Sequence, residues 1–146
     1  MSGAVPAAIG VTFIWIGLVI GVSFIEAPIK FRAPGVTLPI GLGIGRLVFR
    51  ATNTLEGVLA AVLAGAVILA PPPLALLIPS VTAVCILAAQ LAFIRPRLTR
   101  RSNAVIAGED GRTRSHAHHA YIVLESIKVV TLFVGGITAL TTMTVS

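Results

Sequence analysis

Four long apolar runs dominate the order of hydrophobic and polar positions along this chain. They cover residues 5–25, 49–70, 74–94 and 119–141, and roughly 20 such residues let a helix cross a bilayer. Three consecutive prolines at 71–73 separate the second run from the third, because proline cannot continue a helix. The pattern predicts an all-α fold, an integral membrane four-helix bundle that forms a single domain over residues 1–146. Since no positively charged segment precedes the first run, we expect an uncleaved span there.

Composition agrees with a membrane location. Hydrophobic residues make up 56% of the chain and charged residues 11%, whereas soluble domains are about a quarter charged. The mean hydropathy is +1.01. The lipid bilayer is therefore the expected partner. The preference for Ala, Gly and Arg is typical of a GC-rich bacterium and predicts the bacterial plasma (inner) membrane.

The basic residues predict the orientation. The net charge is +6, and Lys and Arg gather in residues 30–50 and 95–114, while the connection around 71–73 carries no charge. Such residues mark cytoplasmic connections, so we expect both termini to be extracytoplasmic. Their position beside apolar runs indicates contact with anionic lipid headgroups rather than nucleic acid.

The first connection is unusual because residues 33–45 are apolar but rich in Gly and Pro. This composition predicts an interfacial or re-entrant segment, although the second helix could begin earlier than residue 49, near Pro39. Gly41, Gly43 and Gly45 lack the spacing of a nucleotide-binding loop, so we interpret them as sites of close helix packing.

Polar residues interrupt three of the apolar runs at helical spacing, so that each set lies on one helix face. The third run contributes only Gln90 near its end, with Thr82 nearer its middle. The sets are Ser23, Glu26 and Lys30; Arg46, Arg50, Asn53 and Glu56; and His118, Tyr121, Glu125 and Lys128. The members of these three sets, without Ser23, are the candidate ligand- or ion-binding residues.

A charged side chain near the bilayer centre costs at least ~2.5–3.5 kcal/mol, so we expect the charged groups to face inward and pair. The predicted network sets Glu26, Glu56 and Glu125 against Lys30, Arg46, Arg50 and Lys128.

Two interpretations of this network compete. In the first, the protein binds or transports a small solute, an ion or a lipid headgroup, with the carboxylates holding a proton or cation and the arginines an anionic group. In the second, the protein is a non-catalytic interaction or scaffold subunit, and the network only fixes helix register.

A minor third interpretation is a metal- or haem-binding membrane protein that uses His118. This histidine shares a helix face with Glu125, but seven residues separate them by about 10 Å, too far to chelate one ion. We predict no cofactor and no catalytic residue, because the sequence holds no recognisable catalytic motif. The single cysteine, Cys85, excludes a disulfide within the chain.

Three short motifs resemble the small four-helix membrane proteins of the TMEM205-like group (domain of unknown function 4149). They are the run from Gly21 to Arg32 with its Ser23-Phe24 pair and Ala27-Pro28-Ile29, the Arg95-Pro96-Arg97 segment, and a histidine, His118 or His119, that opens the last helix ahead of Glu125. The resemblance implies four spans and a membrane location but no established activity.

Small residues at Gly17, Gly21, Gly57, Ala61 and Gly65 predict close helix contacts. Gly17 and Gly21 have GxxxG spacing, which favours a homo-oligomer or a partner membrane protein.

Overall fold

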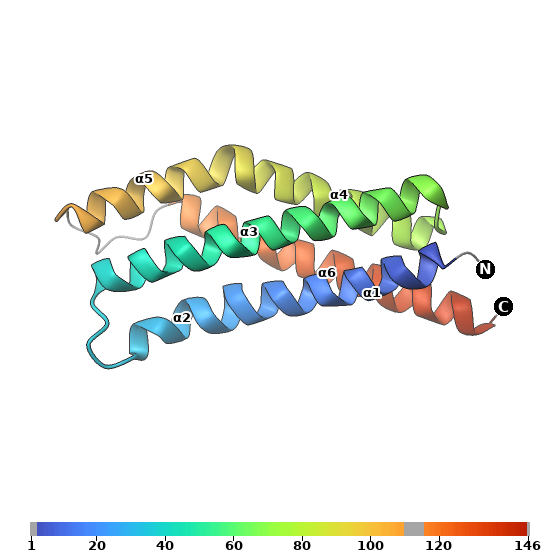
Figure 1. Cartoon of the computed structure of the whole chain (residues 1–146), viewed down its shortest axis with the longest axis horizontal. Helices are drawn as coiled ribbons and strands as arrows, with labels where there is room; N and C mark the ends of the chain where they lie inside the picture. Colours follow the sequence, from blue (N-terminus) through green and yellow to red (C-terminus); the bar gives the residue numbers. More distant parts are fainter. Residues whose placement is uncertain (1–2, 110–115, 146) are drawn as a thin grey trace.

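The computed structural model describes residues 3–109 and 116–145. Four helical segments in these ranges are long and apolar enough to cross a membrane: Ala4–Arg32, Leu38–Leu69, Leu74–Ile106 and His116–Val145. No strand occurs in the described ranges. The segments run side by side along the long axis, with both termini at one end (Figure 1). The predicted all-α, multi-pass membrane fold is confirmed.

Two spans are single helices and two are composite. The second span is α3 (Leu38–Leu69) and the fourth is α6 (His116–Val145). The first span consists of α1 (Ala4–Val19), the π-helix η1 (Ile20–Glu26), α2 (Ala27–Ile29) and the 3-10 turn η2 (Lys30–Arg32), and the third of α4 (Leu74–Ala89), the π-helix η3 (Gln90–Ile94) and α5 (Arg95–Ile106).

Each π-helix ends two residues before a proline. Pro28 follows η1 and Pro96 follows η3. A proline inside a helix has no N–H and its ring clashes with the carbonyl four residues earlier. Wider turns relieve this clash, and the backbone N–H groups of Ala27 and Arg95 accordingly donate to carbonyls five residues back. Each π turn changes which side chains face inward.

Each helical segment is longer than the apolar run from which it was predicted. At 1.5 Å per residue, spans of 29 to 33 residues are about 45–50 Å long, more than the hydrocarbon core. The segment predicted as an interfacial or re-entrant loop is shorter than expected, because α3 already begins at Leu38 and only residues 33–37 are non-helical. The earlier helix start near Pro39 is confirmed.

The third helix was predicted to end at Ile94, and this prediction is wrong. The π turn accommodates Pro96, so the chain stays helical to Ile106 and places the basic segment on α5. Arg112 and Arg114 lie outside the described residues.

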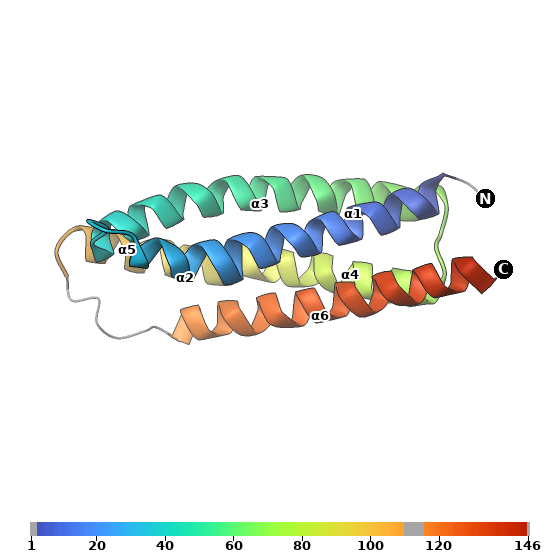
Figure 2. The ribbon, with the colours of Figure 1, turned by 90° about the horizontal axis from the view of Figure 1, so that it is seen from below.

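The half of the bundle nearest the termini has an apolar core, contributed by α1, the end of α3, α4 and the end of α6. Figure 2 shows α6 beside α4 and α1 along this half. Gly135 and Gly136 bring the helices close, because a methyl group on Gly135 would meet Pro79 of α4 and one on Gly136 would meet Phe13 of α1.

The prediction of close helix contacts at glycines is confirmed at two positions: a Cβ at Gly41 would meet Phe31 of the first span, and one at Gly45 would meet Lys30. At Gly43 and at the other predicted glycines it is wrong. A Cβ added at Gly17, Gly21, Gly57 or Gly65 would have no atom within 4 Å. The spacing of small residues does not show whether a glycine faces the bundle or the outside, because an apolar helix tolerates glycine on either face.

Candidate functional site: a buried charge network

The ammonium of Lys128, in the middle of α6, lies between carboxylates from two helices. Its Nζ is 2.5 Å from Glu56 Oε1 on α3 and 2.6 Å from Glu125 Oε1 on α6. It also donates a hydrogen bond of 3.0 Å to Gln90 Oε1 on η3. Lys128 is 0% exposed and both glutamates are 1% exposed. An ammonium has three donors, and here each has an oxygen acceptor.

Three further side chains donate to the two carboxylates. The indole Nε1 of Trp15 on α1 donates to Glu56 Oε1 at 2.7 Å. Ser23 Oγ donates to Glu125 Oε2 at 2.8 Å, and Gln90 Nε2 donates to Glu125 Oε1 at 2.8 Å. All four spans therefore meet at one level. We call these six residues the buried network: Trp15, Ser23, Glu56, Gln90, Glu125 and Lys128.

The position of each residue on its helix directs its side chain into the buried network. Glu125 and Lys128 are three residues apart and so share one face of α6. Glu56 lies on the inward stripe of α3 with Thr52 and Ala60. Ser23 lies within the π-helix η1, and Gln90 is the first residue of η3. Both π turns therefore supply hydrogen-bonding groups to the network.

A layer of aromatic and basic side chains adjoins the network, one turn closer to the start of α3 and α6. Arg95 Nη2 donates to Phe49 O at 3.2 Å and to Asn53 Oδ1 at 3.0 Å. Its guanidinium carbon lies 4.5 Å from the ring centroid of Phe49 and 5.6 Å from that of Tyr121. The two rings pack edge to face at 5.7 Å. We call Phe49, Asn53, Arg95 and Tyr121 the arginine layer.

Arg95 changes the charge balance of the site. It interacts electrostatically with both Glu56 and Glu125. Two carboxylates are thus matched by two basic groups, Lys128 and Arg95. Cation–π contact with two rings further offsets the desolvation of the guanidinium, whose Nε is buried without a hydrogen-bond partner.

The predicted single network of seven charged residues is not what forms. Of these seven, the structure brings together only Glu56, Glu125 and Lys128. Glu26 and Lys30 form a separate, partly exposed ion pair at 3.5 Å. Helical spacing alone cannot distinguish a stripe that faces the bundle from one that faces its edge.

The two arginines predicted on the inward face of α3 lie elsewhere. Arg46 is exposed and its guanidinium binds Asn103 of α5, and Arg50 is exposed. The inward stripe of α3 instead runs through Thr52 and Glu56, a rotation that returns the longer, more polar arginines to the surface. His118 is half-buried, with its ring 6.2 Å from that of His119.

Five residues of the site were absent from the predicted set: Trp15, Ser23, Phe49, Gln90 and Arg95. The clearest signal that the prediction missed is Gln90, because it is the only amide side chain in the third apolar run, residues 74–94. Arg95 was assigned to a connection because the continuation of the third helix past Pro96 was not foreseen. Trp15 gave no signal of a polar contact, because tryptophan is as common in apolar packing as in hydrogen bonding to a buried group.

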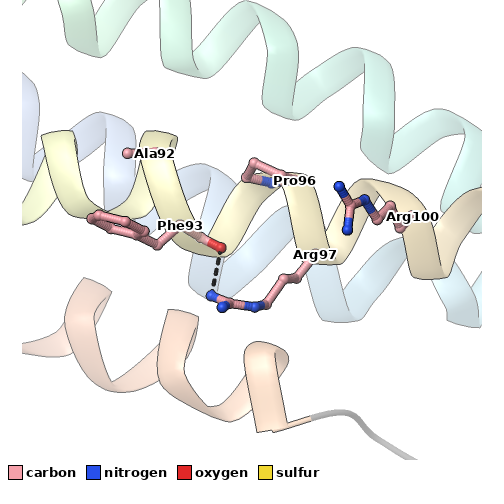
Figure 3. Close-up of a pocket in the computed structure, with 5 residues that line it drawn as sticks. All are labelled: Ala92, Phe93, Pro96, Arg97 and Arg100. Atoms are coloured by element: carbon pink, nitrogen blue, oxygen red, sulfur yellow. Dashed lines mark hydrogen bonds between the residues drawn. The ribbon is translucent and has the colours of Figure 1, made fainter.

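Within residues 3–109 and 116–145, no group of three or more His, Cys, Asp and Glu side chains could hold a metal ion. A concave surface of about 180 Å³ lies outside the network, on η3 and α5. Ala92, Phe93, Pro96, Arg97 and Arg100 line it, and Arg97 Nη1 donates to Phe93 O at 2.9 Å (Figure 3).

The chain matches no protein-family model, and neither curated proteins nor solved structures show significant similarity to it. The resemblance to the TMEM205-like group stays a prediction.

Proposed function

We propose that this protein binds and transports a small solute or ion of positive charge, or a proton, at the buried network. The observation that carries this proposal is the position of the Lys128 ammonium, between Glu56 and Glu125 and inside a membrane-spanning segment. Carboxylates from two different helices here bind a cationic group away from water. A site that binds a tethered cation has the chemistry to bind a free one.

Energetics support a functional origin for the network. Replacing a buried ion pair with apolar residues of similar volume is often neutral or stabilising. Ionisable groups inside membranes usually mark ion, proton or substrate pathways. The two π turns, which supply Ser23 and Gln90, add to this support, since such turns are frequent at functional sites.

The two sides of the network differ, and the difference suits a site that a cation reaches from one side of the membrane at a time. Toward the termini lies the packed apolar core, where the buried hydroxyls of Thr12 and Ser80 donate to carbonyls of their own helices. On the other side lies the arginine layer, with Lys30 beyond it at 5.4 Å from the Phe49 ring. Access from the basic end therefore requires movement of Arg95 and Tyr121, and release to the other side requires separation of α6 from α1 and α4.

Flux into liposomes tests the proposal. Purified protein is reconstituted with a trapped pH-sensitive dye, and pulses of Na⁺, K⁺ or a small organic ammonium are applied. We expect a protein-dependent signal that Glu125→Gln abolishes and that Glu26→Gln, which removes a carboxylate outside the network, leaves intact. No flux with any of these cations, or equal flux in the Glu125→Gln variant, would refute the proposal.

A second candidate function is a non-catalytic interaction subunit whose network fixes helix register. The observation that favours it is the complete pairing of Lys128, whose three donors all have acceptors. In that case wild-type protein shows no flux, and Glu125→Gln mainly lowers stability, by ~3–5 kcal/mol for a broken buried pair.

The bundle's surroundings are part of the proposal. The exposed basic residues at the connection end, which include Arg32, Arg50, Arg97 and Arg100, favour contact with anionic lipid headgroups on the cytoplasmic side of a bacterial plasma membrane. Both termini are then extracytoplasmic. The outward-facing Gly17 and Gly57 leave surface for a second copy or a partner membrane protein.

A further inference from the structure

The Lys128 ammonium occupies a cage of oxygen atoms. Within 3.0 Å of Nζ lie Oε1 of Glu56, Oε1 of Glu125 and Oε1 of Gln90, from three different helices. Oxygen ligands of this type, carboxylate and amide, are those that hard inorganic cations prefer. We infer that this cage is a binding site for a monovalent inorganic cation such as Na⁺ and that Lys128 is its internal competitor. This inference rests on the proposed function and names its ligand class.

Charge balance selects a monovalent ion. Two desolvated carboxylates that share one site cannot both stay ionised unless a positive charge lies between them. When the Lys128 side chain withdraws, a single positive charge must take its place. A monovalent cation does so charge for charge, whereas a divalent cation adds a charge to a site that already has Arg95 beside it.

The cage remains ordered when the ammonium leaves, because other donors orient its carboxylates. Trp15 binds the same oxygen of Glu56 that faces Lys128, and Ser23 binds the far oxygen of Glu125. Gln90 is also fixed, since its amide nitrogen donates to Glu125 while its oxygen faces Nζ. Lys128 is the member of the cage with the longest flexible stem and is therefore the one that moves.

Removal of the competitor is the test. Lys128→Met keeps the apolar stem and removes the charge, so its cage should bind alkali cations more tightly than the wild-type cage, in which the Lys128 ammonium competes. Thermal unfolding in mild detergent is measured in NaCl, KCl, LiCl and, for equal ionic strength, choline chloride. We expect the Tm of Lys128→Met to rise by roughly 5 °C or more in one alkali chloride over choline chloride. Wild type should shift by much less.

Two variants control for general effects of charge. Lys30→Met removes a lysine that pairs with Glu26 outside the network and should show no cation-specific shift. Lys128→Met combined with Glu125→Gln lacks one carboxylate of the cage and should lose the shift. Trp15 is the only tryptophan of the chain and contacts the cage, so its fluorescence should change as the same cation is titrated into Lys128→Met.

Equal Tm values for Lys128→Met in all four salts would overturn the inference, as would an equal shift in Lys30→Met. Lys128→Gln, whose amide can still donate to the carboxylates, serves if Lys128→Met folds poorly. If neither variant folds in any alkali chloride, the cage does not accept these ions and the inference fails. Flux in wild-type liposomes without a cation response in either variant would leave the proposed function standing and reject the cage alone.

Discussion

Trp15 Nε1 lies 2.7 Å from Glu56 Oε1, the same carboxylate oxygen that receives the Lys128 ammonium at 2.5 Å. This hydrogen bond joins the first span to the second at the level of the buried network. Trp15 itself is 0% exposed and also belongs to the apolar core. The indole therefore connects the apolar half of the bundle with its charged centre.

Trp15→Phe should lower stability while leaving the fold intact. The substitution removes a donor to a buried carboxylate, and hydrogen bonds to charged groups contribute ~1.5–3 kcal/mol. We expect a loss of about 2 kcal/mol or more in the free energy of unfolding, measured by circular dichroism during titration with a denaturing detergent. Ile14→Val, at a position 62% exposed on the same helix, should change it by less than about 0.5 kcal/mol. A similar small change in Trp15→Phe would show that the hydrogen bond contributes little.

The sequence predicted the fold class well because a bilayer imposes a simple rule, in which apolar runs of sufficient length become helices. It predicted a helix start near Pro39 but not the continuation of the third helix past Pro96. Proline normally marks a helix boundary, but Pro39 occupies the first turn, where no N–H is needed, and a π turn accommodates Pro96. The π turn at Pro96 does not follow from local composition.

The candidate site was predicted only in part, for a related reason. Spacing places residues on one face of a helix, but the rotation of that helix in the bundle decides whether the face is inward. Glu125 and Lys128 were placed correctly together. On α3 the prediction held for Asn53 and Glu56 and failed for Arg46 and Arg50, which are exposed. The inward position of Ser23 and Gln90 depends on π turns, which the sequence pattern does not reveal.

Gly135→Ala should destabilise the bundle where α4 and α6 touch. A methyl group there would lie 2.6 Å from both Cβ and Cγ of Pro79 and 3.3 Å from the carbonyl oxygen of Ala75. A proline ring cannot move aside as a flexible chain can, so we expect a loss of ~1–3 kcal/mol. This loss in the free energy of unfolding is measured by titration with a denaturing detergent.

Gly57→Ala is the matched control for this helix-packing prediction. A methyl group at Gly57 meets nothing within 4 Å, and alanine favours helices over glycine by up to about 1 kcal/mol. We therefore expect unchanged or slightly higher stability. If both alanine variants behave alike, the close approach of α4 and α6 is not a constraint on the fold.

The concave surface on η3 and α5 should retain anionic lipid. Arg97 and Arg100 flank an apolar floor of Ala92, Phe93 and Pro96, which suits a phosphate group above an acyl chain. Each basic residue near a membrane surface contributes about 1 kcal/mol to binding of anionic lipid. The double variant Arg97→Ala/Arg100→Ala should lower retention of phosphatidylglycerol during purification by roughly 10-fold or more, as measured by mass spectrometry.

Arg32→Ala/Arg50→Ala removes the same charge from exposed positions at the same end of the bundle and should retain most of the lipid. Equal losses in the two double variants would assign the effect to general charge. Phosphatidylcholine, which has no net charge, should be retained equally by all three proteins.

Orientation can be tested with single cysteines, because the chain contains only Cys85. In a Cys85→Ala background, Gly3→Cys marks the end that carries both termini, and Ala107→Cys marks the exposed end of α5 beside the basic segment. Basic connections stay in the cytoplasm. A membrane-impermeant maleimide added to intact bacterial spheroplasts should therefore label Gly3→Cys and spare Ala107→Cys until the membrane is permeabilised. The reverse pattern would invert the bundle, so that the arginine layer would face the extracytoplasmic side and cations would reach the network from there.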